Sequence, residues 1–326
     1  MRRTWFEERL LHVFRLWVQM SEGLRPTDAR AAIALHRWID PKLRDRHKWP
    51  ERFGLFVRYA LSCEIAPEEL LEQLLRLRPE VLQGYPNQIA AVGLAAKRSG
   101  TTGLKPRLIL SGGETLTPLL LSQIREYFCA PVLVNYAAHE FNLLAYQCRE
   151  EGLFHVCGES LILEVIHEGR PAAEGETGEV VGTALHSFAM PVIRYRLNDL
   201  VTVGPQRCPC GLEGPTLSAI QGRVIEMFTL PSGRKLHPYS LVVPMSKAAV
   251  SWLRQYQIIQ ERVDSIRFLM EPVREPSPEE MASVQRVLRD ELEESVAIQL
   301  ELVSEIRPGS NGKHRPYYTR VKSGSA

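Results

Sequence analysis

Gly112, Gly113 and Glu114 stand together in the string SGGETL, directly after a short apolar run at 107–111. A run of this length, bounded by Pro106 and a glycine, predicts a buried strand. Glycines at the carboxyl end of a strand let the backbone approach a ligand, and parallel α/β sheets bind their ligands at that end. The three residues are therefore candidates for lining a ligand pocket, with a glycine-rich turn that binds nothing as the alternative.

Tyr136 and Glu140 lie in the string NYAAHE, where the next apolar run, 132–136, ends. Because the carboxyl ends of parallel strands meet at one edge of a sheet, we expect both side chains near SGGETL. An aromatic ring can stack on a nucleobase, and a carboxylate can bind Mg²⁺ beside phosphate groups. The two strings together indicate a nucleotide site.

Asp199 ends the string AMPVIRYRLND, which also contains Arg194 and Arg196. A carboxylate at this position can accept hydrogen bonds from both hydroxyls of a ribose. The alternative is that the two arginines pair with Asp199 or with surface acids, in which case the string is structural.

Arg223 and Lys313 stand in two further glycine-containing strings, IQGR at 220–223 and RPGSNGKHR at 307–315. A lysine in such a loop is usually solvated. A flexible positive charge is also what an adenylate-forming reaction requires at the phosphate, so Lys313 is a candidate for that role.

Three thiols and one imidazole form a set that tetrahedral Zn²⁺ accepts. The set is Cys148, His155, Cys208 and Cys210, the last two within the tight string CPCG. Four protein ligands leave no open coordination position, so the zinc would be structural. The alternative is reduced core cysteines beside an unrelated histidine. The other cysteines are expected to be packing residues: Cys63, Cys129 and Cys157.

Helices and strands alternate in the part of the chain that must position these residues. The predicted elements are a helix at 66–81, a helix from the turn at 84–86 to about Lys97, a strand at 107–111, a helix at 117–128 and a strand at 132–136. A strand, a helix and a strand at this spacing predict a parallel βαβ unit.

The character of the sequence changes at about residue 150. Short strand-like runs then follow one another without helices, which predicts a mostly antiparallel or barrel-like section. From about 225 the runs at 256–260, 265–270 and 296–303 predict strands, and 277–295 predicts a helix capped by Ser277. We expect a core domain at 1–224 and a small α+β domain at 225–326.

The composition is that of an ordinary globular protein: 326 residues, 44% hydrophobic and 24% charged. A formal charge of +2 is too balanced to suggest nucleic-acid binding. The first 20 residues predict an amphipathic helix packed on the protein, because charged residues interrupt any signal-peptide core. No apolar stretch reaches the roughly 20 residues that span a membrane. With no disulfide framework, a cytoplasmic location is expected.

The strings GYPNQI, SGGETL, NYAAHE, AMPVIRYRLND, CPCG, IQGR and GSNGKHR resemble, in this order, the phenylacetate-CoA ligase family of adenylate-forming enzymes, including its capsular-polysaccharide-associated branch. The resemblance covers about residues 80 to 320. It implies an α/β adenylate-forming ligase-like core with a β-rich section and a small C-terminal α+β domain. Members of the family use ATP and Mg²⁺ to convert a carboxylic acid to an acyl-adenylate, and then transfer the acyl group to coenzyme A.

The resemblance also implies roles for single residues. Tyr136 would stack on adenine, Glu140 would bind Mg²⁺, and Asp199 would hold the ribose hydroxyls. Arg223 would support the ribose or phosphate, and Lys313 would touch the phosphate during adenylation. Gly112, Gly113 and Glu114 would line the nucleotide and acyl pocket. Related sequences carry a similar cysteine and histidine set, which favours a structural zinc.

The sequence departs from the family pattern at several positions. Ala137 and His139 replace a glycine and a threonine, and Asn198 replaces a glycine. Ile225 stands where the hinge usually has an acidic residue. The phosphate-binding Ser/Thr/Gly loop belongs well upstream of SGGETL, and residues 1–80 supply none. The string RSGTTGLKP resembles that loop, but it follows a predicted helix, so it is interpreted as a helix-strand connector.

The sequence therefore predicts ATP-dependent activation of an aryl or acyl acid and its transfer to coenzyme A. The alternative is a truncated or degenerate nucleotide-binding relative that is noncatalytic or depends on a partner for the phosphate loop. A zinc-centred hydrolase is a weaker option, since it would require a missing fourth ligand. The expected partners are a small carboxylic acid and coenzyme A, with no nucleic acid and no membrane. A homodimer is left open.

Overall fold

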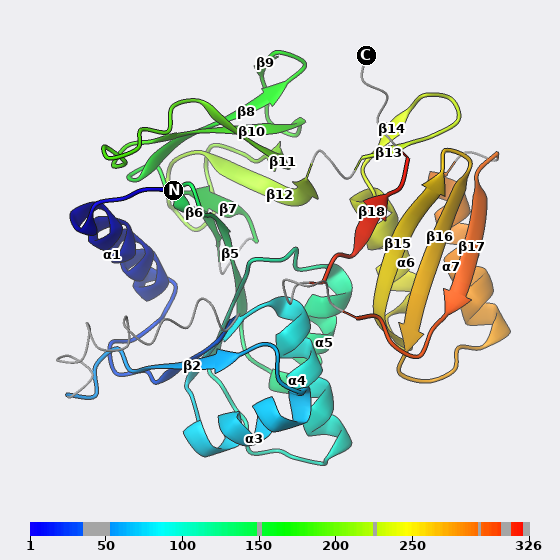
Figure 1. Ribbon diagram of the computed structural model, residues 1–326, viewed down its shortest axis with the longest axis horizontal. Helices are drawn as coiled ribbons and strands as arrows, with labels where there is room; N and C mark the ends of the chain where they lie inside the picture. Colours follow the sequence, from blue (N-terminus) through cyan, green and yellow to red (C-terminus); the bar gives the residue numbers. More distant parts are fainter. Residues whose placement is uncertain (35–52, 149–151, 224–226, 293–294, 308–313, 322–326) are drawn as a thin grey trace. The chain divides into compact units, whose positions relative to one another are not determined.

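The structure is a computed structural model that describes residues 1–34, 53–148, 152–223, 227–292, 295–307 and 314–321 (Figure 1). The chain divides into two compact units. The first comprises residues 1–116 and 123–220, and the second comprises residues 117–122 and 221–326. The predicted domain boundary at 224/225 lies outside the described residues.

A twelve-stranded mixed sheet forms the centre of the first unit, in the order β2-β1-β3-β4-β5-β6-β7-β12-β11-β10-β8-β9. The strands from β2 to β5 are parallel to one another. Their bounds are β1 (Arg30–Ala34), β2 (Arg58–Ser62), β3 (Val81–Gly84), β4 (Leu108–Gly112) and β5 (Val132–Ala138). The predicted parallel βαβ unit is therefore confirmed as β4-α5-β5, whereas the sequence patterns did not predict β1, β2 or β3.

The helices of this half begin at the signals that the sequence carries. They are α1 (Trp5–Ser21), α3 (Pro67–Leu77), α4 (Pro86–Arg98) and α5 (Pro118–Phe128). In α1 the Thr4 hydroxyl accepts a hydrogen bond from the Glu7 amide, and the Glu7 carboxylate accepts one from the Thr4 amide. This capping box satisfies two amides at the start of the helix.

Helix α3 is shorter than predicted. It buries Leu70, Leu71 and Leu74, as its periodicity indicates. It ends at Leu77 because Arg78 adopts a left-handed conformation with φ 47°. The residues that the pattern assigned to the last helical turn are therefore the entry to β3.

Short strands follow in antiparallel pairs, as the sequence predicts for this section. They are β6 (Asn142–Gln147), β7 (Phe154–Val156), β8 (Leu161–His167), β9 (Arg170–Pro171), β10 (Thr177–Ala184), β11 (Tyr195–Val203) and β12 (Thr216–Arg223). Their apolar side chains form one core with Tyr136, Phe141 and Val18 of α1. Strand β11 begins at Tyr195 and continues without interruption to Val203.

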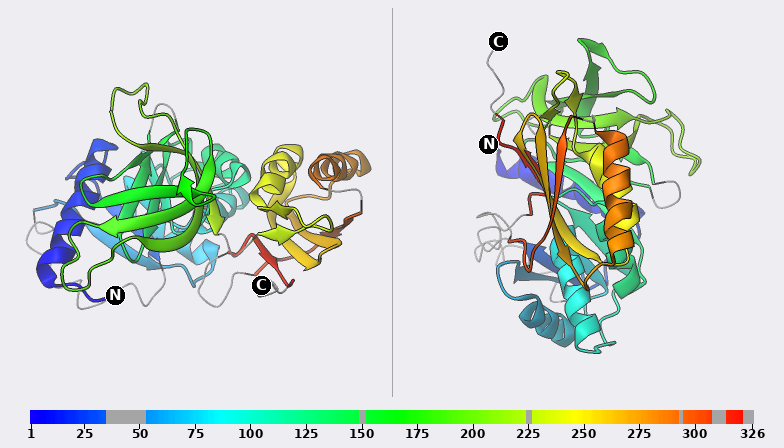
Figure 2. Two further views of the ribbon diagram at one scale, coloured as in Figure 1. Left: turned by 90° about the horizontal axis from the view of Figure 1, so that it is seen from above. Right: turned by 90° about the vertical axis from the view of Figure 1, so that its right-hand side faces the viewer.

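A four-stranded sheet in the order β17-β16-β15-β18 and a two-stranded hairpin belong to the second unit. The elements are β13 (Phe228–Thr229), β14 (Lys235–Leu236), α6 (Tyr239–Ala249), β15 (Leu253–Arg262), β16 (Ser265–Pro272), α7 (Pro278–Glu291), β17 (Ala297–Leu302) and β18 (Tyr317–Thr319). Helices α6 and α7 lie together on one face of the four-stranded sheet (Figure 2). The predicted β-β-α-β order is confirmed, with α6, the hairpin and β18 added to it.

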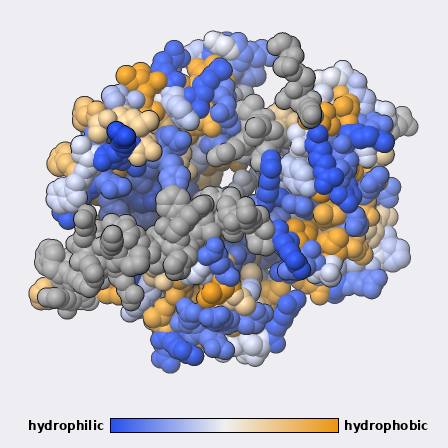
Figure 3. All heavy atoms as spheres, viewed as in Figure 1, coloured by the Kyte–Doolittle hydropathy of each residue, from blue (hydrophilic) through white to orange (hydrophobic). Residues whose placement is uncertain are grey.

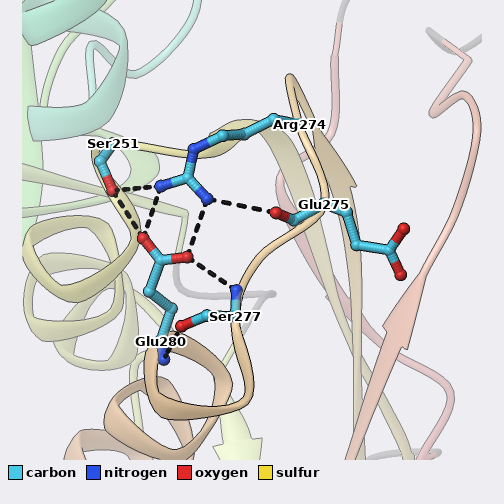
Figure 4. Close-up of polar contacts among 5 residues, drawn as sticks. All are labelled: Ser251, Arg274, Glu275, Ser277 and Glu280. Atoms are coloured by element: carbon cyan, nitrogen blue, oxygen red, sulfur yellow. Dashed lines mark hydrogen bonds and ion pairs between the residues drawn. The ribbon is translucent and has the colours of Figure 1, made fainter.

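The start of α7 is held by a cluster of polar contacts (Figure 4). The Ser277 hydroxyl accepts from the Glu280 amide, and the Glu280 carboxylate accepts from the Ser277 amide. Arg274 donates to both carboxylate oxygens of Glu280 at 2.6 and 2.9 Å. These contacts, the arginine first, lower the pKa of Glu280 to about 2.

Hydrophilic side chains cover much of the face drawn in Figure 3, with hydrophobic side chains scattered among them. Among the described helices, none is long and apolar enough to cross a membrane.

Candidate functional site

Gly112 closes β4 and pairs with Asn135 of β5. A Cβ atom at Gly112 would lie 2.9 Å from the Asn135 carbonyl oxygen, so the close approach of the two backbones requires glycine here. Gly113 has φ 81°, a conformation that favours glycine. Both glycines therefore have a backbone reason for their presence at the carboxyl edge of the parallel strands.

Glu114 is oriented by Asn87 of α4. The Asn87 Nδ2 atom donates to the Glu114 Oε2 atom at 2.9 Å, and Glu114 is half-buried. Asn87 lies in the string GYPNQI but was not predicted as a site residue. An amide that follows the turn at the start of a helix, opposite a glycine-rich strand end, is the signal that could have identified it.

Tyr136 and Asp199 come together although their strands lie far apart in the sheet order. Four strand steps separate β5 from β11, which in a flat sheet would place them about 19 Å apart. The Tyr136 hydroxyl nevertheless donates a hydrogen bond of 2.7 Å to the Asp199 Oδ2 atom. The sheet must therefore curl strongly between β5 and β11. The Tyr136 ring is 8% exposed.

Asn198, the residue before Asp199, has the backbone conformation that a glycine would adopt at this position. Asn198 has φ 58°, and asparagine is one of the few residues that tolerate the left-handed region. The two arginines of the string do not pair with Asp199. Arg194 pairs with Glu164 at 3.1 Å and Arg196 pairs with Glu179 at 3.5 Å, so the surface-acid alternative holds for both.

Glu140 lies in the turn between β5 and β6. Its backbone oxygen accepts from the Arg3 guanidinium at 3.0 Å, and the neighbouring His139 oxygen accepts from the same nitrogen at 2.6 Å. The half-buried Glu140 carboxylate forms no hydrogen bond or ion pair with any residue that the structure describes. The carboxylate is therefore available to a cation on the described part of the chain.

Arg223 and Lys313 are not joined to these residues by the structure. Arg223 is the last residue of β12, and its side chain lies outside the described residues. Lys313 and the hinge positions Ile225 and Glu226 also lie outside them. Their roles remain predictions.

The string at 98–106 is a connector, as interpreted from the sequence. It links the end of α4 to the start of β4, and the Thr101 amide donates to the Ala96 carbonyl at 2.8 Å. The start of β4 lies at the amino edge of the parallel strands, whereas Gly112 lies at the carboxyl edge. SGTTG is therefore at the opposite edge from SGGETL.

The predicted cysteine and histidine set does converge. The ligand atoms of Cys148, His155, Cys208 and Cys210 all lie within 4.8 Å of one another. The first two flank the turn between β6 and β7, and the others lie between β11 and β12. The pairing of β7 with β12 thus brings together residues that lie about 60 positions apart in the sequence.

The distances within this group fit tetrahedral zinc. Zn–S and Zn–N bonds of about 2.3 and 2.0–2.1 Å give tetrahedral edges of about 3.8 Å between two sulfurs and about 3.6 Å between sulfur and nitrogen. The Cys148 and Cys208 Sγ atoms are 3.7 Å apart. The Cys210 Sγ and His155 Nε2 atoms are 3.5 Å apart. A disulfide is excluded, since both cysteines of the sulfur pair are free.

Burial governs the charge of these groups. It lowers the pKa of His155, which keeps the imidazole neutral, and it raises the pKa of the Cys208 thiol to about 11.

Of the cysteines outside the set, Cys63 and Cys157 are buried as expected. Cys129 is exposed with φ 49°, so its prediction as a packing residue was wrong.

Two curated proteins match the chain in sequence, and both are phenylacetate-coenzyme A ligases. The Thermus thermophilus protein is 27% identical over 228 residues, which cover 67% of this chain and 50% of that protein. The Escherichia coli K12 protein is 51% identical over 39 residues, which cover 12% of this chain and 9% of that protein. No family model matches.

Solved structures with the same fold include acyl-CoA ligases. A 2-hydroxyisobutyryl-CoA ligase in complex with an acyl-adenylate has a TM-score of 0.73 at 20% identity, covering 91% of this chain and 66% of that chain. A benzoate CoA ligase from Burkholderia xenovorans LB400 has a TM-score of 0.64 at 16% identity, covering 93% of this chain and 64% of that chain. The chain thus spans about half to two thirds of the length of these proteins. The chain is therefore similar in sequence to phenylacetate-coenzyme A ligases, and it shares its fold with acyl-CoA ligases.

Proposed function

We propose that this chain carries the adenosine- and acyl-binding part of an ATP-dependent acid-CoA ligase. The observation that carries the proposal is the hydrogen bond between Tyr136 and Asp199, which joins two motif residues across a curled sheet. Such a pair, next to the glycine edge of β4, supports a nucleoside site rather than a structural turn.

Asp199 would accept hydrogen bonds from the ribose hydroxyls, and Tyr136 would fix the orientation of that carboxylate and stack on adenine. Gly112 and Gly113 would let the ligand approach the backbone, and Glu114 would line the acyl side. Arg223 and Lys313 would supply positive charge at the phosphate.

Glu140 would hold Mg²⁺, which when bound neutralises phosphate charge. A carboxylate without a described partner, close to the predicted nucleotide edge, is compatible with this role. The adenylation step itself requires the acid's carboxylate oxygen to attack the α-phosphorus as pyrophosphate leaves, so the chain's residues act by positioning and by stabilising charge.

Cys148, His155, Cys208 and Cys210 would hold a structural zinc. The sulfur-sulfur and sulfur-nitrogen distances, which match tetrahedral edges, support this assignment. The metal would tie the loop between β11 and β12 to the turn after β6. With no open coordination position, a hydrolytic role is not proposed.

Binding and catalysis are tested separately. AMP and a non-hydrolysable acyl-adenylate analogue should bind the purified chain, and Asp199→Ala should weaken that binding at least tenfold through the loss of hydrogen bonds to a charged group. Tyr195→Phe, an exposed tyrosine on the same strand, is the matched control. Unchanged AMP affinity in Asp199→Ala would overturn the nucleotide site.

A second candidate is nucleotide binding without independent catalysis. The position of SGTTG at the amino edge favours it, because this Ser/Thr/Gly string then lies away from phosphates bound beside SGGETL at the carboxyl edge. Carboxylate-dependent pyrophosphate exchange should be measured across a panel of aryl and acyl acids. Weak exchange, together with an affinity for AMP that equals the affinity for ATP, supports the second candidate. Robust exchange that Lys313→Ala abolishes supports a complete ligase, and loss of exchange in Thr101→Ala would give the connector a role.

A further inference from the structure

Three arginines and one glutamine meet on one face of the first unit. Arg30 and Arg58 open β1 and β2 and are direct partners in the parallel register, so their side chains lie on the same face about 4.8 Å apart at the backbone. Arg15 and Gln19 are one turn apart on α1 and share a helix face. We call these four residues the donor cluster.

A hydrogen bond connects the helix to the strands. The Arg30 Nη1 atom donates to the Gln19 Oε1 atom at 2.9 Å. Arg15 lies close enough to Arg58 that burial, and next the positive charge of Arg58, lower the pKa of Arg15 to about 10. The same two causes, burial first, lower the pKa of Arg30 to about 10. Arg15 and Arg30 therefore remain cationic at neutral pH, and the positive charge of Arg58 acts on both.

The cluster contains hydrogen-bond donors that nothing described satisfies. Gln19 is 2% exposed, and its Nε2 atom is buried without a partner. The Arg15 Nε atom is also buried without a partner. Within the described ranges, no carboxylate forms an ion pair with Arg15, Arg30 or Arg58. A buried donor without an acceptor is costly, and a bound anion would supply acceptors to both.

The two strand arginines of the cluster lie at the opposite edge of the sheet from the glycines, whereas Arg15 donates to the Asn142 backbone oxygen at 3.4 Å, beside the turn after β5. Arg30 and Arg58 begin their strands, whereas Gly112 ends β4 and Tyr136 lies in the second half of β5. In parallel strands these ends lie on opposite edges of the sheet. Arg58 is exposed, so a ligand can reach the cluster from solvent.

We propose that the donor cluster binds the phosphate group of a phosphorylated ligand. Guanidinium groups bind phosphate oxygens in pairs of parallel hydrogen bonds, and the amide of Gln19 adds a neutral donor from the helix side. The ligand chemistry is a dianionic phosphate, carried either by free phosphate or pyrophosphate, or by a phosphorylated cofactor such as coenzyme A. The site does not depend on the proposed ligase function.

Calorimetric titration tests the proposal with inorganic phosphate, pyrophosphate, coenzyme A and dephospho-coenzyme A, each at matched ionic strength in chloride. Wild type should bind at least one of them, and Arg30→Gln and Arg58→Gln should each weaken that binding about 10- to 100-fold. Arg25→Gln changes an exposed arginine between α1 and β1 and should bind as wild type. Tighter binding of coenzyme A than of its dephospho form identifies the 3′-phosphate as the group bound, whereas binding of phosphate or pyrophosphate with equal binding of the two coenzyme forms identifies the free anion as the ligand.

Two results would overturn the proposal. One is the absence of phosphate binding to wild type, and the other is equal binding to wild type and Arg58→Gln. Because Arg58 is exposed, its variant is expected to fold even if Arg30→Gln does not. Unfolding of the ligand-free Arg58→Gln protein gives an independent check. Its stability should be unchanged or higher, since a like charge is removed, and lower stability would mean that Arg58 has a structural partner instead.

Discussion

The hydrogen bond between Tyr136 and Asp199 can be tested by removing a single oxygen atom. Tyr136→Phe keeps the ring, which is 8% exposed within the core of the curled sheet, and deletes only the donor. A hydrogen bond to an ionised group contributes about 1.5–3 kcal/mol, and the half-buried Asp199 carboxylate would lose it. We expect the free energy of unfolding to fall by about 1.5–3 kcal/mol, with no cavity cost because the ring remains.

Denaturant unfolding of a double-mutant cycle measures this coupling. Tyr136→Phe, Asp199→Asn and the double variant are compared with wild type, and the two single effects should fail to add by about 1 kcal/mol or more. Tyr195→Phe, on the same strand as Asp199 but exposed, should change stability by less than about 0.5 kcal/mol.

The same variants report on function. If Tyr136 orients the carboxylate, Tyr136→Phe should weaken AMP binding by less than Asp199→Ala does, since the carboxylate remains present. Additive stability effects in the cycle, together with AMP binding unaffected by either change, would refute both the contact and the positioning role.

Three further predictions concern the metal group, the second unit and the glycine edge. Metal analysis should find about one zinc per chain. Cys208→Ser should lose both the zinc and thermal stability, because the binding energy of a structural metal contributes to the folding energy. Full zinc content and an unchanged melting temperature in Cys208→Ser would contradict this prediction. Burial lowers the pKa of His314 from 6.5 to about 4, so the unfolded chain takes up a proton first as pH falls. The free energy of unfolding should therefore decrease by up to about 3 kcal/mol as the pH falls from about 6.5 to about 4. His314→Gln should remove this pH dependence from the unfolding curves. An identical pH dependence in the variant would mean that another group causes it. Gly112→Ala should be destabilising in thermal unfolding because its Cβ atom meets the Asn135 oxygen at 2.9 Å, while Gly158→Ala, with open space around it, should not; equal effects would argue against the close backbone approach.

Much of the local structure follows from short-range signals. Pro67 begins a helix because its ring suits the first turn, and Ser277 with Glu280 caps α7 through two reciprocal hydrogen bonds. The strand at 107–111 was predicted because Pro106 and Gly112 bound its apolar run. Strands β1 and β2 escaped prediction because their sequences, RAAIA and RYALS, begin with a charged residue and carry no such proline and glycine boundaries.

The sequence by itself determined which residues could do chemistry: the glycine-carboxylate string, the tyrosine, the aspartate and the cysteine-histidine set. Only the tertiary structure decided which of them meet. Tyr136 reaches Asp199 because the sheet curls, and Cys148 reaches Cys208 because distant strands pair. Gln19 meets Arg30 because helix α1 crosses to a strand that the sequence patterns did not predict. Curling and long-range pairing arise from packing between segments far apart in the chain, and no local window of sequence contains them.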